Sequence, residues 1–283
     1  MLCSRYGGIR MSNYKLIAFD MDGTLLNSEK KISPKSIEAI NKAIEKGKMV
    51  ILNTGRCPAE LEEYLEILDN IEYLNCVSGA LVFDRKNNTK IYSKILDVET
   101  VKQLLDIAKE EDDMVHLLSK DSIVQKDKID KMYDYHMGVY QEMFTRVTDK
   151  WEDLYLQYNE NPFPIEKLNI YHASSEGRER TKQKILESNL EVELADAETT
   201  SLEISAKGID KGIGLEKLCE YHKISLDETI VVGDANNDIA ALKKSGLAIA
   251  MDNANENVKK LASVIVSDND HDGCVEAIEE YLL

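Results

Sequence analysis

The sequence predicts an α/β protein whose core is a doubly wound parallel sheet, with a second α+β domain inserted into it. Three observations support this. Short apolar runs alternate with helical patterns at both ends of the chain, which is typical of right-handed strand–helix–strand units. Polar residues follow directly after three of these runs. The middle of the chain changes composition and becomes rich in Lys, Asp, Tyr and Met.

The first element is an apolar run, Leu16–Phe19, which predicts a buried strand. Asp20 and Asp22 follow it at once and lead into a turn at Gly23. Ligands of open α/β sheets bind beyond the carboxyl ends of the strands. One acidic residue at such a position can attack an electrophile, while its neighbour handles a proton.

A helix and a second strand come next. Ser33 and Pro34 fit the N-cap and first position of a helix, and Gly47 fits its end. Three isoleucines recur between them at helical spacing: Ile37, Ile40 and Ile44. The apolar run from residue 49 to 52 predicts a strand, and it leads to a hydroxyl and a glycine, Thr54 and Gly55.

The middle of the chain predicts the inserted domain. A β-hairpin is expected at Leu81–Asp84 and Ile91–Tyr92, because Asn87 and Asn88 form a turn signal between the two runs. Mixed helices and short strands follow. We therefore expect an N-terminal extension, a catalytic core in two segments and an inserted α+β domain: residues 1–12, then 13–97 with 200–283, and 98–199.

The C-terminal part returns to strand–helix alternation. Lys211 precedes a helical pattern, and the apolar strand Thr229–Val232 leads to Asp234. The helix from Asp238 to Lys244 follows, and further strands are expected at 247–250 and 264–266. A nucleophilic acid, a hydroxyl, a cation and an acidic pair at strand ends fit phosphoryl transfer, which depends on positioning and charge neutralisation.

These residues resemble the haloacid dehalogenase superfamily of phosphohydrolases, and within it the Cof-type group with a large C2-type cap. The four motifs occur in the family's order, and the likeness extends from Tyr14 to Leu282, thinly across the cap. The tail is the most specific part, with three matching segments: 233–238, 246–251 and 253–254. The resemblance implies a Rossmann-like core with an inserted α+β cap.

The resemblance also implies roles for four residues around the phosphoryl group. Asp20 would be the nucleophile and form an aspartyl-phosphate. Asp22 would protonate the leaving oxygen and then activate water. Thr54, helped by the amide of Gly55, would bind a phosphoryl oxygen, and Lys211 would neutralise charge as a point cation.

A metal site is implied in the same way. Asp20, Asp234 and the backbone carbonyl of Asp22 would hold Mg²⁺, with Asp238 holding a metal-bound water. Asn237 would contact the substrate phosphate. Magnesium prefers oxygen ligands in an octahedron and keeps several waters, so few direct carboxylates suffice.

Three positions depart from the family's pattern. Ser78, Ala241 and Asp252 stand where asparagine, methionine and glycine are more usual. None of these changes removes a catalytic group, but Ser78 lies near the expected pocket. In the inserted domain, six side chains could face a substrate, although packing is the favoured interpretation of each: Tyr133, Tyr135, His136, Tyr140, Arg146 and Trp151.

Composition limits the partners. The net charge of −17 argues against nucleic acid, whose phosphates select basic surfaces. The five dispersed cysteines fit reduced thiols of a cytoplasmic protein: Cys3, Cys57, Cys76, Cys219 and Cys274. No apolar run approaches a membrane span, and residues 1–10 lack the apolar region of a secretory signal. Met11 is a second candidate start.

The leading functional hypothesis is Mg²⁺-dependent hydrolysis of small phosphorylated metabolites, such as sugar phosphates or phosphorylated cofactors. A phosphomutase of the same superfamily would instead return the phosphoryl group to a sugar. A receiver-type signalling protein also carries acids, a hydroxyl and a lysine on a parallel sheet. It lacks the acid–base role given to Asp22, and the length of this chain and its inserted domain argue against it.

Overall fold

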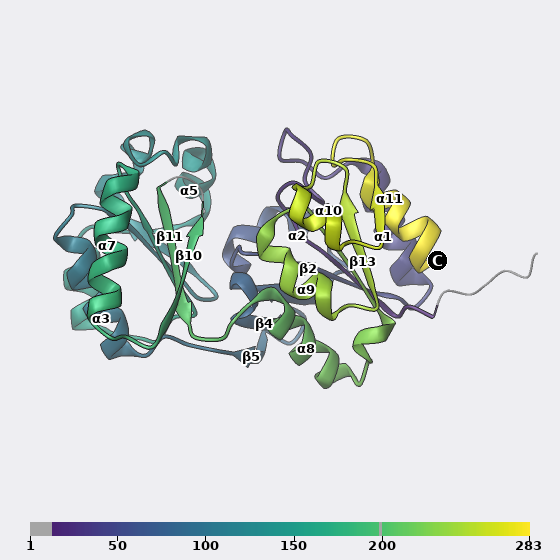
Figure 1. The fold of residues 1–283 in the computed structure, drawn as a ribbon, viewed down its shortest axis with the longest axis horizontal. Helices are drawn as coiled ribbons and strands as arrows, with labels where there is room; N and C mark the ends of the chain where they lie inside the picture. The colour runs from purple at the N-terminus through teal and green to yellow at the C-terminus, as the bar shows by residue number, and fades with distance from the viewer. Residues whose placement is uncertain (1–12, 198–199) are drawn as a thin grey trace, which may run out of the picture. The chain divides into compact units, whose positions relative to one another are not determined.

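The computed structural model describes residues 13–197 and 200–283 (Figure 1). It divides into two compact units, the chain up to Ile51 with Lys223–Leu283, and Leu52–His222. The predicted extension of residues 1–12 lies outside the described residues, as does Cys3.

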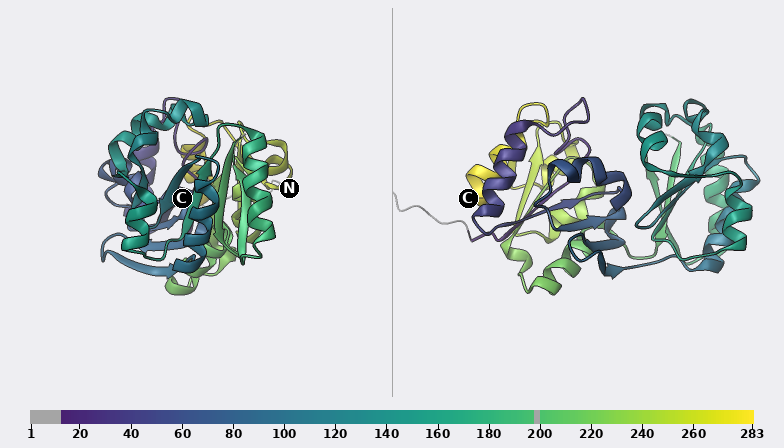
Figure 2. Two further views of the ribbon diagram at one scale, coloured as in Figure 1. Left: turned by 90° about the vertical axis from the view of Figure 1, so that its left-hand side faces the viewer. Right: turned by 180° about the vertical axis from the view of Figure 1, so that it is seen from behind.

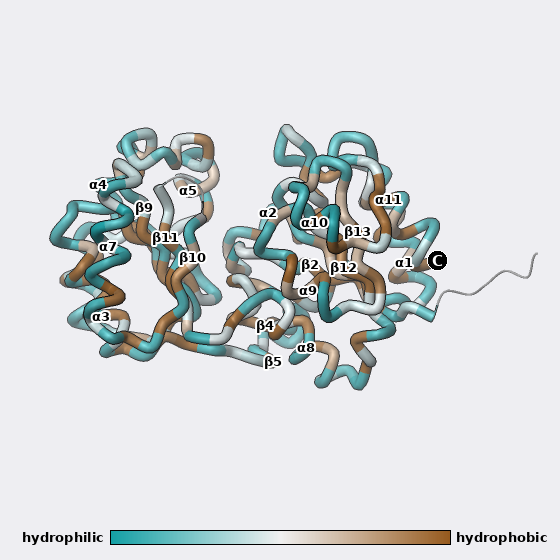
Figure 3. The backbone as a smooth tube through the Cα atoms, viewed as in Figure 1, coloured by the Kyte–Doolittle hydropathy of each residue, from teal (hydrophilic) through white to brown (hydrophobic). Residues whose placement is uncertain are grey.

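The first unit carries a sheet in the order β14-β13-β12-β1-β2, and its central strands β12 and β1 are fully buried. β1 pairs in parallel with β12, β12 with β13 and β13 with β14. Hydrophobic residues run along β12 and β13 (Figure 3). The bounds confirm the predicted strands: β1 Leu16–Phe19, β2 Met49–Asn53, β12 Thr229–Gly233, β13 Leu247–Met251 and β14 Val264–Val266.

Among the described residues of this unit are four α-helices: α1 Pro34–Glu45, α9 Ile239–Lys244, α10 Glu256–Leu261 and α11 Gly273–Ala277. The predicted cap of α1 is confirmed, because the Ser33 hydroxyl accepts from the Ser36 amide and Gly47 follows the helix at a φ of 77°. The three isoleucines of this helix differ in burial. Ile40 is buried, but Ile37 and Ile44 are only half-buried, because the small residues Ser36, Ala39 and Ala43 line the buried face instead. Short 3₁₀ or π segments complete the unit: Leu226–Glu228, Asn236–Asp238 and Ile278–Leu282.

The second unit begins with the last residues of β2, which pair in parallel with β3. The predicted hairpin is confirmed as the antiparallel strands β4 and β5, so this part of the sheet is mixed. The elements here are η1 Pro58–Leu61, α2 Glu62–Ile67, β3 Tyr73–Cys76, η2 Val77–Gly79, β4 Leu81–Asp84, β5 Thr89–Ser93 and α8 Lys211–His222.

The same unit holds a six-stranded sheet in the order β10-β11-β9-β6-β7-β8, antiparallel except for the parallel pair β7 and β8. Its strands are β6 Met114–Leu118, β7 Ser122–Gln125, β8 Asp149–Trp151, β9 Lys167–Tyr171, β10 Val192–Ala197 and β11 Ser201–Ala206. The boundary predicted after residue 199 falls between β10 and β11, which pair with each other. The division into 13–97, 98–199 and 200–283 stays a prediction.

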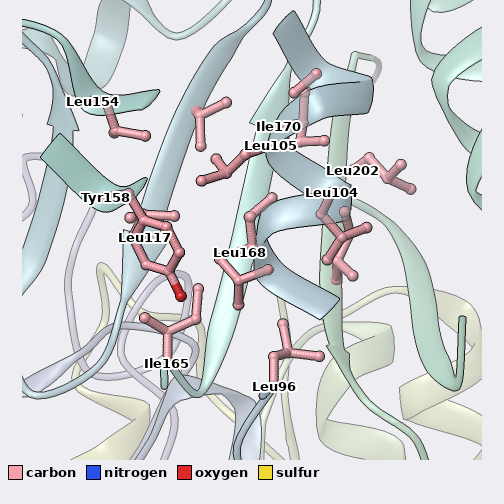
Figure 4. Packing of buried hydrophobic residues seen from close by; sticks show 14 of the residues in the cluster. Leu96, Leu104, Leu105, Leu117, Leu154, Tyr158, Ile165, Leu168, Ile170 and Leu202 are labelled. Atoms are coloured by element: carbon pink, nitrogen blue, oxygen red, sulfur yellow. The ribbon is translucent and has the colours of Figure 1, made fainter. Parts of the chain in front are cut away.

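Helices cover one face of this six-stranded sheet. α3 Val98–Lys109 and α7 Ser175–Glu187 lie there (Figures 1 and 2). Their apolar side chains enclose a cluster with Leu168, Ile170 and Leu202 of the sheet (Figure 4). The remaining helices are short: α4 Lys126–Ile129, η3 Met132–Tyr135, η4 Gly138–Tyr140, α5 Gln141–Val147 and α6 Leu154–Glu160.

Within the part of the chain that the structure describes, no helix combines the length and the apolar character that a bilayer crossing requires. The four described cysteines, Cys57, Cys76, Cys219 and Cys274, are buried free thiols.

Candidate active site

Three of the predicted carboxylates come together in the first unit. Asp20, Asp234 and Asp238 each place a carboxylate oxygen so that the three lie within 4.8 Å of one another. Asp20 and Asp238 are buried, while Asp234 is half-buried. Like charges this close repel each other, so the arrangement suits a divalent cation that balances them. The cluster therefore has the donor type and the spacing that a Mg²⁺ site needs.

Strand pairing creates this cluster. Phe19 of β1 lies opposite Val232 of β12, and the two strands are parallel, so Asp20 and Asp234 leave the same edge of the sheet. The Asp20 amide donates to the Val232 carbonyl at 3.1 Å. Asp238 is oriented from the next turn, where its Oδ2 accepts from the amides of Asp234 and Ala235, each at 3.1 Å.

Two glycines leave room for the carboxylates. A Cβ on Gly23, whose φ is 81°, would lie 2.5 Å from Oδ2 of Asp234. A Cβ on Gly233 would lie 2.5 Å from Oδ2 of Asp238. Both distances are far below normal contact, so neither position accepts a side chain unless a carboxylate moves. Gly23 additionally needs the left-handed conformation that glycine adopts without penalty.

Two residues around the cluster were given no role in the sequence analysis. Thr24 is buried, and its Oγ1 donates to Oδ1 of Asp234 at 2.8 Å. Asn253 donates through Nδ2 to the carbonyl of Gly23 at 2.7 Å. Asn253 lies in the matching segment 253–254 and Thr24 directly follows Gly23, so their position in the chain was the available signal. Their contacts fix the turn after β1 and the orientation of Asp234.

The field of the cluster acts on a neighbouring thiol. Burial raises the pKa of Cys274, and the negative charges of Asp20 and Asp234 raise it further. The Cys274 thiol donates to the carbonyl of Thr24 at 3.4 Å. This residue is thus a neutral thiol at physiological pH, next to a strongly negative site.

Two other predicted residues of this unit lie outside the cluster. Asp22 forms an ion pair with Lys30, at 2.9 Å between Nζ and Oδ1, and its side chain is 35% exposed. Asn237 is exposed in the short helix Asn236–Asp238. A half-exposed carboxylate can exchange protons with water, which is what an acid–base group requires.

The second unit contains Thr54 and Gly55, directly after β2. Thr54 is buried, and its Oγ1 accepts from the Arg56 amide at 3.2 Å. The Thr54 amide donates to the carbonyl of Asn75, which lies on the neighbouring parallel strand β3, at 2.8 Å. The Ser78 amide donates to the Thr54 carbonyl at 3.1 Å. These bonds hold the loop with the Thr54 hydroxyl and the Gly55 amide in a fixed conformation.

A left-handed backbone run supports this loop. Val77, Ser78 and Gly79 have φ values of 53°, 57° and 94°. Asparagine adopts this region more readily than serine, which gives a physical reason why asparagine is usual at position 78. A Cβ on Gly79 would lie 1.9 Å from the carbonyl oxygen of Asp210, so only glycine fits between the two segments.

Lys211 directly follows Asp210 in the chain. It begins α8 and is only 1% exposed. Its carbonyl accepts from Nδ2 of Asn75 at 2.8 Å, and the same amide group donates to Oδ1 of Asn53 at 2.6 Å. Asn75 was not singled out from the sequence, although it is the second-last residue of β3, near the sheet edge where ligands bind. It connects β2, β3 and the start of α8.

The six side chains named in the inserted segment are mostly accounted for by packing or by the surface. Trp151 packs against the apolar cluster of α3 and α7, and Tyr135 and Tyr140 belong to a second cluster. Tyr133 is 72% exposed, and His136 is exposed as well. Arg146 makes a bidentate ion pair with Glu63.

Known proteins of similar sequence and structure are hydrolases and phosphatases. A family model described as haloacid dehalogenase-like hydrolase matches residues 17–278. The 5-amino-6-(5-phospho-D-ribitylamino)uracil phosphatase YcsE of Bacillus subtilis is 29% identical over 95% of this chain and 96% of its own length. The pyridoxal phosphate phosphatase YbhA of Escherichia coli is 26% identical over 95% and 99%. A crystal structure of a haloacid dehalogenase-like hydrolase from Bacteroides thetaiotaomicron has a TM-score of 0.84 at 26% identity, covering 94% of this chain and 99% of that one.

Proposed function

The chain belongs to the haloacid dehalogenase-like hydrolase family and is a phosphatase, and on this premise we propose that it hydrolyses phosphomonoesters of small metabolites with Mg²⁺ through a phosphorylated Asp20. The observation that carries the proposal is the cluster of Asp20, Asp234 and Asp238, with oxygens within 4.8 Å. Such a cluster has little structural use on its own, because three close carboxylates destabilise the fold unless a cation or substrate chemistry needs them.

In the first step, a carboxylate oxygen of Asp20 attacks phosphorus and the bond to the leaving oxygen breaks. Asp22 gives its proton to that oxygen, so an alcohol departs and an aspartyl-phosphate remains. In the second step, Asp22 takes a proton from water, whose oxygen attacks phosphorus and releases Asp20 and inorganic phosphate. Dividing the displacement in this way replaces one high barrier by two lower ones.

The remaining residues bind and orient the phosphoryl group. The Thr54 hydroxyl and the Gly55 amide are donors for phosphoryl oxygens, and Lys211 supplies a positive charge that is worth more because the residue is buried. Asn237 is a further donor. Asp20, Asp234 and the carbonyl of Asp22 would hold Mg²⁺, with Asp238 oriented toward a bound water. When bound, the cation would offset the charge that accumulates between carboxylates and phosphate.

The relatives support small phosphorylated metabolites as substrates, since they are named for a phosphorylated ribityl compound and for pyridoxal phosphate. We also propose a cytoplasmic location, supported by the four buried free thiols.

The test is a phosphate-release assay with a panel of sugar phosphates, phosphorylated cofactors and p-nitrophenyl phosphate. Release is expected with Mg²⁺, to stop with excess chelator and to return when Mg²⁺ is restored. Calorimetric titration with Mg²⁺ should give a binding signal that Asp234→Asn weakens and that the exposed control Asp252→Asn does not. Full turnover in excess chelator would refute the metal assignment. Transfer of the phosphoryl group to an added sugar, in place of water, would point to a phosphomutase.

A further inference from the structure

The six-stranded sheet has a second face, opposite α3 and α7, which carries polar side chains beside a second apolar cluster that includes Met114 and Tyr171. Leu168 and Ile170 of β9 point into the cluster beneath α3 and α7 (Figure 4). Because successive side chains of a strand alternate between faces, Lys167 and Asn169 point the other way. On β11, Leu202 and Ile204 belong to the same cluster, so Glu203 shares the face of Lys167 and Asn169.

Lys167 lies beside the loop that we assign to phosphoryl binding. Its Nζ is 3.3 Å from the carbonyl oxygen of Gly55 and 3.4 Å from Oγ of Ser78. The side chain is only 3% exposed, and Glu203 balances its charge at 3.1 Å. A buried ammonium normally carries a stronger set of hydrogen bonds than these long ones, because its desolvation is expensive.

Asn169 contributes an unsatisfied acceptor next to this pair. The residue is 7% exposed, and Oδ1 has no hydrogen-bond partner among the described residues, while Nδ2 donates to the hydroxyl of Tyr171 at 3.2 Å. Glu203 lies directly across from it on β11, and His116 lies across on β6. The His116 ring does not fill the gap, since its nitrogens contact Tyr171 and Ser122.

We propose that Lys167, Asn169 and Glu203 bind the hydroxyl-bearing part of the substrate, and that this part is a sugar or polyol chain. The proposal rests on the phosphatase function proposed above and narrows its substrate class. A hydroxyl group accepts one hydrogen bond and donates another. The ammonium of Lys167 supplies the donor, and the carboxylate of Glu203 and Oδ1 of Asn169 supply acceptors.

This set of groups discriminates against substrates without hydroxyls. A site built to hydrogen-bond a hydroxyl rejects an analogue that lacks it, because the buried polar groups are then left unpaired. An aliphatic chain of the same length would leave Oδ1 of Asn169 without a donor, and Glu203 with the ammonium of Lys167 alone. Because Lys167 lies next to Gly55 and Ser78, the selection by its ammonium acts close to the phosphoryl group, on the first carbons of the substrate.

The experiment compares sorbitol 6-phosphate with n-hexyl phosphate, two six-carbon primary phosphomonoesters that differ in hydroxyl groups. The measured quantity is the ratio of their kcat/KM values. We expect Asn169→Leu, which removes the acceptor at similar volume, to lower this ratio about tenfold. Glu203→Gln keeps an acceptor but loses its charge, so a fall of about threefold is expected.

Gln183→Leu is the matched control, because it makes the same amide-to-leucine change at an exposed position of α7, and it should leave the ratio unchanged. If Asn169→Leu does not fold, Glu203→Gln carries the test, since this side chain is 29% exposed. If both variants keep the wild-type ratio, these three residues serve only the structure of the sheet, and the inference is overturned. Equal kcat/KM for both compounds in the wild type would also overturn it, while hydrolysis of no phosphomonoester would instead overturn the proposed function.

Discussion

The acidic cluster of the first unit and the polar face of the six-stranded sheet are built in different ways. The cluster is held by backbone: Asp20 and Asp234 leave paired strands, and the main-chain amides of Asp234 and Ala235 fix Asp238. The polar face is held by side chains, which alternate with an apolar core and contact each other across strands. Backbone-held groups suit chemistry that every substrate shares, whereas alternating side chains can change without disturbing the sheet.

The sharpest way to break this comparison is Asp20→Asn, which removes the nucleophilic anion at nearly constant shape. We expect turnover to fall by about 10³-fold or more for every substrate alike. Activity with several phosphomonoesters and a melting curve check this, with Asp252→Asn as the exposed control. A loss of activity confined to some substrates would show that the acidic cluster also selects substrates, contrary to the proposed division of roles.

The next largest effect is expected from adding one methyl group at position 233, and it concerns the affinity for Mg²⁺. Gly233→Ala would place a Cβ 2.5 Å from the carboxylate of Asp238, so that carboxylate must move. We expect Mg²⁺ affinity to fall about tenfold or more, as it does when groups that orient metal ligands are disturbed. Magnesium titration followed by activity measures it. Wild-type affinity would mean that the backbone does not hold Asp238 as tightly as its two amide bonds suggest.

Directly before β6 of the six-stranded sheet, a buried acid gives a pH effect on stability. Burial, followed by the charge of Glu111, raises the pKa of Asp113 from 3.8 to about 7. The folded state therefore binds this proton more tightly than the unfolded chain, and stability falls as pH rises from about 4 through 7. Asp113→Asn imitates the neutral acid at every pH.

The variant should thus gain stability over the wild type above pH 7, on the order of 2 kcal/mol, and little at pH 4. Urea unfolding at several pH values tests this, and Thr181 and His172 remain available as neighbours of the new amide. An equal gain at all pH values would rule out titration of Asp113 as the cause.

The smallest effect is expected for Arg146→Ala. This arginine was a candidate substrate contact from the sequence, but it pairs with Glu63 at the surface. Exposed ion pairs contribute about 0–1 kcal/mol. The sorbitol-to-hexyl ratio should change less than twofold, so a larger change would extend the selective region beyond the polar sheet face.

The sequence predicted the part of the site that depends on short stretches of neighbouring residues. Strands β1, β2 and β12 follow from apolar runs, and Asp20, Thr54 and Asp234 follow from being the polar residues at or just beyond their ends. The contact of Asn75 with Lys211 could not be predicted in this way, because it joins residues 136 positions apart. The same holds for Lys167 near Gly55, at a separation of 112.

The face of α1 shows a related limit. Isoleucine spacing selected Ile37, Ile40 and Ile44, but close packing placed Ser36, Ala39 and Ala43 on the buried side. Hydrophobicity predicts that a helix is amphipathic, whereas the depth of each side chain depends on how near the neighbouring element comes.

The backbone conformation of Val77 costs the folded protein stability. A β-branched residue at a φ of 53° is strained, and such strain costs about 1–3 kcal/mol. Asparagine or glycine would relieve it, so laboratory selection for heat resistance should find Val77→Asn or Val77→Gly early. Val77 is also buried, so each variant trades lost apolar contact against relieved backbone. If such a variant melts at a higher temperature but hydrolyses phosphomonoesters more slowly, position 77 is a site of trade-off between stability and activity.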